Sequence, residues 1–504
     1  MGRTGEADPL TQSTRVGHET ASARSSHTEE WLTFFSSELA VQPTPAVLGA
    51  ILAAGILFDI AVRSGVATLA SVVSIIGEVV ILFGLGRARN GHARALLTTV
   101  PLFAVWFALR TSPTLLFFNV IACGALLLLG ASLARSGSIW DLSVPRIVLR
   151  SIQAVVQFLR TPSFIARSVA SSEDTSPRKL GGIVRGIALA LPLVLLLGAL
   201  LASADVVFAS IFEFDGGPWV SHVVAVFVGA LGMGTLLRMA SVRAAEPPPV
   251  RRSQLGVAEW TIVLGALDVL FAAFAIARIA SLSEGGRRVI ESAGLTYAEY
   301  ARSGFFQLLA VAAIAGTTLV TLRAFAATGS RAERRFKVMA LFAVVLTLAI
   351  VVSAFQRLVL YEDAFGLTML RLYSHTAIVW VGLALILLGV VLVTRPKRPW
   401  LAPATGIAAL VLLFGLNVLN PEAFVARHNI HTRGSTAFDP MYLSRDLSDD
   451  ALPTIADNLD RVDAESRRLL EGRLCSRDQE TRGWASFNLA RHRANEARRT
   501  LCRR

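Results

Sequence analysis

The fold is decided by two apolar runs, residues 338–356 (VMALFAVVLTLAIVVSAFQ) and 370–393, which stand on either side of the polar stretch Tyr361–His375 (YEDAFGLTMLRLYSH). Each run is long enough, or nearly so, to cross about 30 Å of bilayer hydrocarbon as an α-helix. The polar stretch holds two acids, an arginine and two tyrosines, and we expect it to form a short turn and the start of a helix. The sequence therefore predicts two membrane-crossing helices joined by a polar turn.

The composition of the whole chain indicates the same class of protein. The 504 residues are 53% hydrophobic and 17% charged, whereas soluble domains carry about 25% charged residues. The net charge of +13 does not require a nucleic-acid partner, because cytoplasmic loops of membrane proteins are rich in basic residues. Only three of the 49 basic residues are lysines, which favours a GC-rich bacterial genome. We expect an all-α polytopic transmembrane helix bundle in a bacterial plasma membrane.

Apolar runs of spanning length recur along the chain and divide it into regions. The eleven runs lie at residues 45–62, 66–86, 95–109, 114–134, 183–203, 219–239, 257–279, 305–325, 338–356, 370–393 and 403–419. The predicted regions are a disordered cytoplasmic tail (1–44), four spans (45–134), a cytoplasmic loop with an amphipathic helix (135–182), seven spans (183–420) and a small extracytoplasmic helical domain (421–504). With eleven spans, the two ends of the chain lie on opposite sides of the membrane.

The loops predict which side is cytoplasmic. Loops on the N-terminal side hold many more arginines and lysines than loops on the other side, and the loop 204–218 has no basic residue. Because basic loops remain in the cytoplasm, we expect a cytoplasmic N-terminus and an extracytoplasmic C-terminus.

One inner segment, residues 142–160, has helical periodicity without the hydropathy of a span. The apolar positions on one face are Ile147, Val148, Ile152, Val155, Val156 and Leu159, and the polar positions off that face are Arg150, Gln153, Gln157 and Arg160. A helix lying on the inner leaflet and a linker helix packed on the bundle both fit this pattern.

The composition becomes polar after Asn420, where amphipathic helices are expected. Ser448 is a candidate N-cap that places Asp449 and Asp450 in the first turn of a helix. Cys475 and Cys502 lie near the ends of two predicted helices, and they could form a disulfide if this region is extracytoplasmic.

Polar residues gather at three span ends that share the predicted outer face. They are Tyr297, Glu299, Tyr300, Arg302, Tyr361, Glu362, Asp363, Arg371, Tyr373, Asn417, Asn420, Arg427 and Asn429. They fit an aromatic belt that anchors helices at the interface. They equally fit a polar cavity that opens outward, since charged groups at span ends need partners.

Acidic residues inside spans form a second candidate site. Asp59, Glu78 and Asp268 lie within the first, second and seventh runs. An ionisable group at bilayer depth is a functional candidate, so Glu78 and Asp268 suggest a proton- or cation-coupled path. Buried hydrogen bonds or ion pairs that fix helix packing are the alternative. His428 and His431 are spaced by three residues, but no HExxH or paired CxxC pattern occurs. We therefore predict no metal site and no cofactor.

Four motifs carry a resemblance to a known family. They are TYAEYARSGFF (296–306), LYEDAFGLTMLRLY (360–373), LNVLNPEAFVARHN (416–429) and WASFNLARHRA (484–494). In this order they resemble the bacterial membrane proteins catalogued as domain of unknown function 4173, which is related to domain 4153. The resemblance covers roughly residues 255–495. SLSEGGRR (281–288) departs from the family pattern, as does His375. The resemblance implies the fold and the topology but no activity.

Three functions remain open from the sequence. The first is a transporter-like protein with an outward-facing polar cavity and the acids Glu78 and Asp268. The second is an envelope enzyme acting on a lipid-linked or cell-wall substrate, with Glu362 or Asp363 as general base and Arg302, Arg371 and Arg427 holding anionic groups. The third is a sensor or scaffold whose C-terminal domain binds an envelope partner. The expected partners are the lipid bilayer and either an envelope protein or a small molecule.

Overall fold

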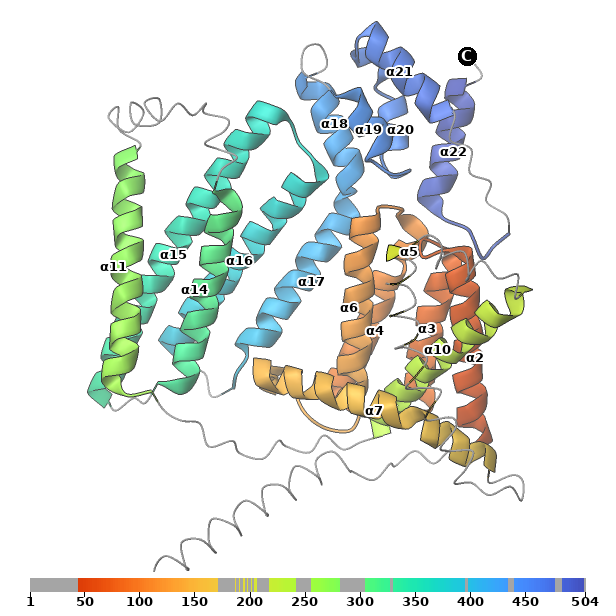
Figure 1. Ribbon diagram of the computed structural model, residues 1–504, viewed down its shortest axis with the longest axis horizontal. Helices are drawn as coiled ribbons and strands as arrows, with labels where there is room; N and C mark the ends of the chain where they lie inside the picture. Colours follow the sequence, from red (N-terminus) through yellow and green to blue (C-terminus); the bar gives the residue numbers. More distant parts are fainter. Residues whose placement is uncertain are drawn as a thin grey trace, which may run out of the picture.

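The computed structural model describes residues 44–170, 217–241, 255–281, 304–326, 330–394, 398–433, 439–475 and 483–502, together with isolated positions between 186 and 205. These residues form helices and connecting turns, with one isolated β-bridge between Leu255 and Ala326. The predicted fold class, an all-α polytopic bundle with a small C-terminal helical region, is confirmed (Figure 1). Predictions for residues 1–43 and for Tyr297, Glu299, Tyr300 and Arg302 lie outside the described residues.

The first bundle surrounds a core that includes Leu97, Val100 and Phe107, none of which is more than 1% exposed. Its helices are α2 (Pro45–Ser64), α3 (Leu69–Gly84), α4 (Gly91–Ala104), α5 (Trp106–Leu109), α6 (Pro113–Ser132) and α10 (Gly217–Ser241). Helices α2 and α10 approach closely at Gly55, where a Cβ atom would lie 2.4 Å from the carbonyl oxygen of Val226. Close contact between spans at small residues is typical of helix packing in membranes.

The second bundle consists of α11 (Val257–Ser281), α14 (Phe305–Phe325), α15 (Ser330–Phe365) and α16 (Met369–Thr394). Helix α17 (Leu401–Leu419) runs between the two bundles (Figure 1). Its Phe414 meets Phe103 and Trp106 of the first bundle edge to face. The stretch Tyr361–Phe365, which the sequence suggested as part of a turn, continues α15, and the turn is Gly366–Thr368.

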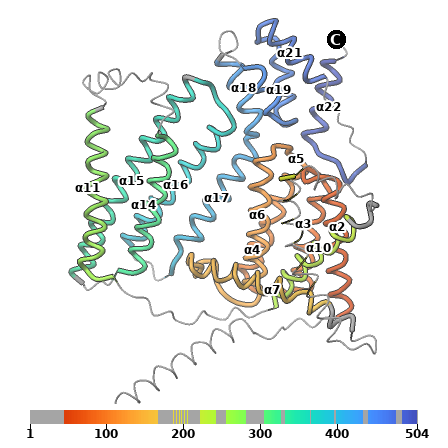
Figure 2. Tube along the Cα trace, in the orientation of Figure 1, coloured from red at the N-terminus to blue at the C-terminus, as the bar shows by residue number. Residues whose placement is uncertain are grey.

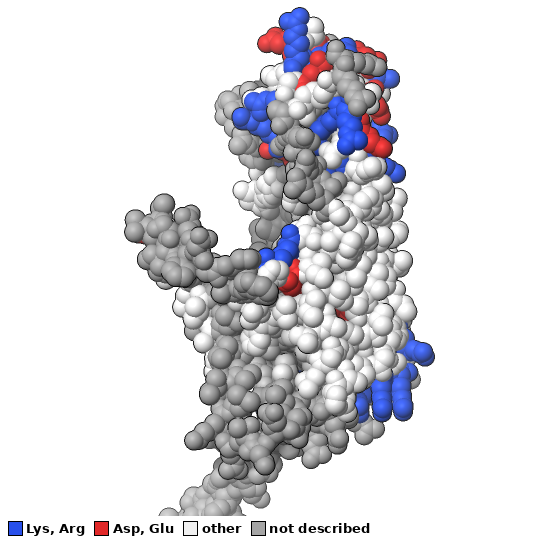
Figure 3. All heavy atoms as spheres, turned by 90° about the vertical axis from the view of Figure 1, so that its right-hand side faces the viewer, with Lys and Arg blue, Asp and Glu red and all other residues white. Residues whose placement is uncertain are grey.

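Nine of the described helices are long and apolar enough to cross a membrane. They match nine of the eleven predicted runs; the second run corresponds to α3, which has 16 residues, and the fifth, 183–203, lies almost wholly outside the described residues. On the face drawn in Figure 3, most charged side chains gather at the two ends of the molecule, and the surface between them is uncharged except for one small group of basic and acidic side chains. An uncharged band between two charged ends is expected of a membrane protein.

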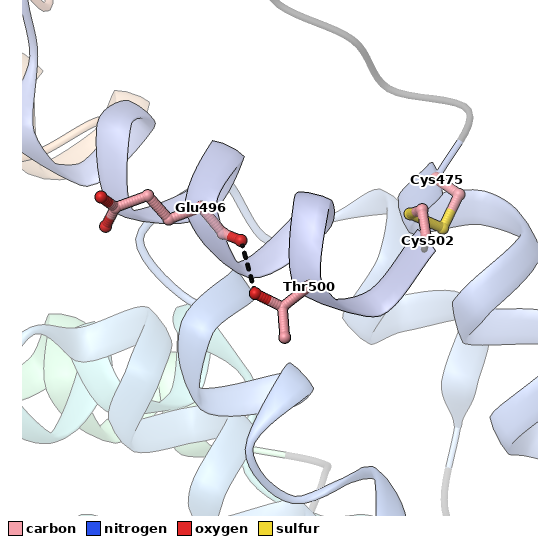
Figure 4. The surroundings of a disulfide bond; sticks show 4 residues. All are labelled: Cys475, Glu496, Thr500 and Cys502. Atoms are coloured by element: carbon pink, nitrogen blue, oxygen red, sulfur yellow. Dashed lines mark hydrogen bonds between the residues drawn. A yellow bond between two sulfur atoms is a disulfide. The ribbon is translucent and has the colours of Figure 1, made fainter. Parts of the chain in front are cut away.

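The C-terminal helices lie at one end of the bundles, and we call them the tail domain. They are α18 (Pro421–Arg433), α19 (Pro440–Arg445), α20 (Leu452–Ala456), the 3₁₀ helix η2 (Leu459–Arg461), α21 (Ala464–Cys475) and α22 (Leu489–Cys502). Their own apolar core includes Ile430, Ile455 and Leu470. A disulfide joins Cys475 to Cys502 at the ends of α21 and α22 (Figure 4).

Helix α7 (Val144–Ala170) lies at the opposite end from the tail domain and runs across the direction of the spans (Figures 1 and 2). It follows the short 3₁₀ helix η1 (Ile139–Asp141) and is ten residues longer at its C-terminal end than the segment 142–160 predicted from the sequence. The tail domain and α7 therefore mark the two ends of the bundles.

Candidate functional site

The tail domain meets the first bundle at the N-terminus of α6, and a buried carboxylate makes the contact. Oδ2 of Asp450 accepts hydrogen bonds from the backbone N–H groups of Thr111 at 2.7 Å and Ser112 at 2.8 Å. The first N–H groups of a helix have no partner inside the helix, and negative charge is favourable at that end. Asp450 therefore caps a membrane-spanning helix whose N-cap residue, Ser112, lies 338 residues earlier in the chain.

Arg110 lies beside this cap and ties α17 to it. Its Nη1 lies 3.6 Å from Oδ1 of Asp450, and its guanidinium donates to the backbone carbonyl of Asn417 at 3.0 and 2.7 Å. The Asn417 side chain exchanges two hydrogen bonds with Asn119 of α6, at 2.8 and 2.9 Å. Both asparagines are fully buried, and the Asn417 amide also donates to the carbonyl of Leu413 at 2.9 Å, so the two buried amides are satisfied by each other and by this backbone group.

Glu422, in the first turn of α18, is the second buried acid at this contact. It is 2% exposed and accepts the backbone N–H of Ser448 at 2.5 Å. The hydroxyl of Ser448 in turn meets the hydroxyl of Thr111 at 2.9 Å. We call this set the joint: Arg110, Thr111, Ser112, Glu422, Ser448 and Asp450.

Burial sets the electrostatics of the joint, because it disfavours every charged form. Burial raises the pKa of Glu422, and the hydrogen bonds from Ser448 only partly offset this effect. Burial also raises the pKa of Asp450, against the lowering effects of the backbone N–H of Thr111 and of Arg110. Burial lowers the pKa of Arg110 although Asp450 favours its charged form. The joint therefore holds two acids and one base that are costly to charge.

Other ends of spans are also capped by the tail domain. Backbone carbonyls of Phe487 and Ala485 accept from the first two N–H groups of α3, at 2.9 and 3.1 Å. The buried amide of Asn488 donates to the carbonyls of Phe107 and Arg110, at 3.1 and 2.9 Å, where α5 ends. Backbone groups at the ends of α3, α5 and α6 thus find hydrogen-bond partners in the tail domain.

The α15–α16 turn is fastened to the tail domain in the same way. The hydroxyl of Tyr442 accepts the N–H of Met369 at 2.8 Å, at the start of α16. The side chain of Asn429 accepts from the N–H of Leu367 at 2.9 Å and donates to its carbonyl at 2.7 Å. Burial raises the pKa of Tyr442, since its phenolate would be desolvated.

The outer residues selected from the sequence divide between these two contacts. Asn417 and Asn420 belong beside the joint, where Asn420 adopts a left-handed conformation (φ 54°) between α17 and α18 and donates to the carbonyl of Asp450 at 3.1 Å. Tyr373 packs its ring 6.1 Å from that of Phe118.

The remaining outer residues lie at the α15–α16 turn. The guanidinium of Arg371 stacks 4.0 Å above the ring of Tyr361 and donates to the carbonyl of Gly366. Glu362 lies between two histidines, 3.8 Å from Nδ1 of His375 and 3.5 Å from Nε2 of His428. Asp363 and Arg427 are exposed. Among the described residues, no group of three or more potential ligands is arranged to hold a metal ion.

The acids inside the spans are not brought together. Glu78 lies on α3 in the first bundle and Asp268 on α11 in the second, with α17 and α6 between the two bundles (Figure 1). Asp59 is paired instead, 2.9 Å from Arg63 and 2.6 Å from His222. The described residues therefore provide no common path through Glu78 and Asp268.

Most of the joint was not selected from the sequence. Asp449 and Asp450 follow Ser448 as first-turn acids of a helix would, but α20 begins only at Leu452. Asp449 pairs with the buried Arg498 at 2.6 Å. Asp450 caps α6 and not the helix that follows it in the chain. Arg110 directly follows the apolar run 95–109, and this position marks it as a charged residue at a span end. Nothing in the sequence indicates its partner.

The fold and its joint define the class, a multi-pass membrane protein with a helical domain fixed at one end of its spans. Residues 97–458 match the family described as domain of unknown function (DUF4153), and because they make up most of the chain, the protein belongs to that family. The sequence motifs suggested domain of unknown function 4173, and the family that matches is the related domain 4153. No curated protein and no solved structure matches the chain. The matched range includes the joint and excludes Asp59, Glu78 and Asn488.

Proposed function

We propose that this protein is a membrane scaffold that holds its tail domain in a fixed orientation at the extracytoplasmic face, where the domain binds an envelope partner. The observation that carries the proposal is the Asp450 cap on α6. A domain on a flexible linker would need no such contact. Here a buried acid, a partly buried base and several backbone groups are committed to one docking geometry, which over-determines the orientation of the domain.

The same contacts argue against an open polar cavity or an enzyme site made from the selected outer residues. Arg371 stacks on Tyr361 and donates to the carbonyl of Gly366, so part of its binding capacity is used within the α15–α16 turn. Asn417 and Asn429 are bound to Asn119 and Leu367. These polar groups satisfy helix ends and turns, which is a structural role.

The transporter-like hypothesis keeps one supporting observation. Oδ1 of Asp268 is buried, and it has no hydrogen-bond partner among the described residues. A buried carboxyl without a hydrogen-bond partner inside a span costs free energy, and such groups commonly mark ion or proton pathways. This second candidate needs Asp268 but not the tail domain.

Complementation separates the hypotheses in bacterial cells that lack the protein, scored on the growth or envelope defect that the loss causes. For a scaffold, Asp450→Ala and a chain truncated before residue 430 fail to complement, whereas Asp268→Asn and Asp363→Asn succeed. Failure of Asp268→Asn with success of Asp450→Ala supports the transporter-like protein instead. Failure of Asp363→Asn alone supports the enzyme.

The control for Asp450 is Asp460→Ala in η2, which removes an exposed acid of the same domain. Membrane fractions must contain each full-length variant at the level of the native protein. A scaffold is contradicted if Asp450→Ala and Asp460→Ala complement equally well while the first variant shows a released tail domain.

A further inference from the structure

We propose that α7 is an interfacial helix whose exposed apolar side chains lie in the lipid of the leaflet at the end opposite the tail domain. The helix runs across the ends of the first-bundle spans (Figures 1 and 2) and is not itself apolar enough to be a candidate span. Its axis therefore lies along the membrane surface rather than through it.

The outward face of α7 is an apolar stripe. Val148, Ile152, Val155 and Leu159 are 52%, 45%, 58% and 40% exposed. Their spacing of three and four residues places them on one side of the helix. Val144, one turn earlier, is also exposed. This is a continuous line of branched side chains over about four turns, so it is not a set of isolated exposed residues.

The face of α7 that packs on the bundle carries buried polar side chains beside Ala154 and Phe164, which belong to the apolar core of the first bundle. Gln157 is 1% exposed and accepts two hydrogen bonds from the guanidinium of Arg238 in α10, at 3.1 and 2.9 Å. Thr161, fully buried, meets Thr235 of α10 at 3.3 Å. Towards the other end, Arg150 donates to the carbonyl of Ser132, the last residue of α6, at 2.9 Å.

On α7, polar side chains such as Gln157 are buried and the apolar stripe is exposed. An amphipathic helix on a water-soluble protein has the opposite arrangement. Its polar side chains hydrogen-bond to Arg238 and to the end of α6, which are buried, and these bonds fix which face points inward. The apolar stripe is left on the outside. In water this arrangement would expose apolar surface at a cost, whereas the acyl chains beside the spans make the same surface favourable.

Lipid is the occupant that position and charge favour. The exposed Arg160 lies at the edge of the stripe, where the side chain of an interfacial helix reaches headgroup phosphates. The neighbouring helix α2 presents exposed apolar residues of its own to the same surroundings, such as Leu52 and Ile56. The stripe therefore belongs to a helix that packs beside a candidate membrane span.

The test uses the full-length protein in liposomes, with a bimane label on a single introduced cysteine at Val155. Cys123→Ala removes the buried free thiol, and the Cys475–Cys502 disulfide keeps the other two cysteines unreactive. The label should lose its fluorescence to lipids brominated on the acyl chain as strongly as a label at Val269, which is 72% exposed on a span. Aqueous iodide should quench it far less than a label at the exposed Glu465.

Two results would overturn the proposal. Iodide quenching equal to that at Glu465 would show that water surrounds the stripe. Protection from both quenchers would show that protein covers it; disulfide-linked dimers of Val155→Cys would then identify a second copy, and their absence would point to another segment of this chain. Ile152→Cys, on the same stripe, repeats the measurement if Val155→Cys does not insert into liposomes.

Discussion

The carboxylate of Asp450 accepts the backbone N–H of Ser112 at 2.8 Å, so a residue of the tail domain caps a helix of the membrane bundle. The tail domain supplies the carboxylate and the bundle supplies the backbone N–H groups, so the contact forms only when the two parts are docked. The strength of that contact, and what depends on it, can be measured.

Asp450→Ala should release the tail domain. Loss of a helix cap costs about 1–2 kcal/mol, and the mutation also leaves Arg110 buried without its acid, which adds to the destabilisation. We expect α19–α22 to be cleaved faster by protease in detergent-solubilised protein and to exchange amide hydrogens faster. The exposed Asp460→Ala should behave like the native protein, and equal cleavage of both variants would contradict the role given to Asp450.

The joint should be stronger in acid than at neutral pH. Burial raises the pKa values of Glu422 and Asp450 above their ordinary values of 4.5 and 3.8, so the docked state binds protons more tightly than the released state. A raised pKa stabilises below the ordinary pKa, and this stabilisation is lost as pH rises through the raised value. Protection of the tail domain from hydrogen exchange should therefore increase as the pH falls from neutral towards the ordinary pKa values of these two acids.

Glu422→Gln provides the check on this pH dependence. The amide keeps the shape of the side chain and cannot ionise, so part of the slope should disappear. A slope of the opposite sign in the native protein would mean that the ionised acids, paired with Arg110, are the preferred state.

The Asn119–Asn417 pair should show strong coupling. Each single change to leucine removes both hydrogen bonds between the two amides and leaves polar atoms of the remaining one unpaired, which costs about 1–3 kcal/mol. In Asn119→Leu, the Asn417 amide keeps its bond to the carbonyl of Leu413. The double variant removes both polar groups and should cost clearly less than the sum of the single variants. Thermal unfolding in detergent gives the three values, and simple additivity would show that the two amides find other partners.

The disulfide should stabilise the tail domain by about 3.5 kcal/mol according to the loop-entropy relation, since Cys475 and Cys502 are 27 residues apart. Reduction should lower the unfolding midpoint of the tail domain and leave the bundles unchanged. The same cysteines test the orientation in a Cys123→Ala background. A membrane-impermeant thiol reagent should label them in intact cells only after reduction, and labelling only after permeabilisation would place the tail domain in the cytoplasm.

Gly55→Ala should separate α2 from α10. The added Cβ would lie 2.4 Å from the carbonyl oxygen of Val226, and overpacking of this kind typically costs about 1–3 kcal/mol. Gly49→Ala is the matched control, because the same methyl group on the same helix meets nothing within 4 Å. Thermal unfolding should distinguish the two, and equal midpoints would show that the helices shift without cost.

Much of the fold could be predicted from the sequence because the signal is local. An apolar run of about 20 residues must satisfy its own backbone as a helix in lipid, whatever surrounds it, so the positions of α2, α14 and α16 follow from composition. The polar turn after α15 was displaced by five residues. Tyr361–Phe365 are polar enough to read as a turn, but the helix continues until Gly366, whose φ of 82° ends it.

The candidate site was predicted in part. Asn417 and Asn420 were selected as polar residues at a span end, and both lie beside the joint. The sequence does not indicate that Asp450 and Glu422 belong to the site. Both follow residues that commonly begin a helix, and an acid in the first turn of a helix needs no further role. Glu78 and Asp268 were paired on the basis of depth, but depth says nothing about which bundle a helix joins.

The sequence by itself determined that this is a polytopic helical membrane protein and where most of its spans lie, because hydropathy acts over one helix at a time. Only the tertiary structure decided that Asp450 caps α6, since helices of similar composition can pack in many ways and the partner lies 338 residues away. It also decided which face of α7 points inward. Helical periodicity places Gln157 and Val155 on opposite faces, but the buried Arg238 of a distant span requires the polar one.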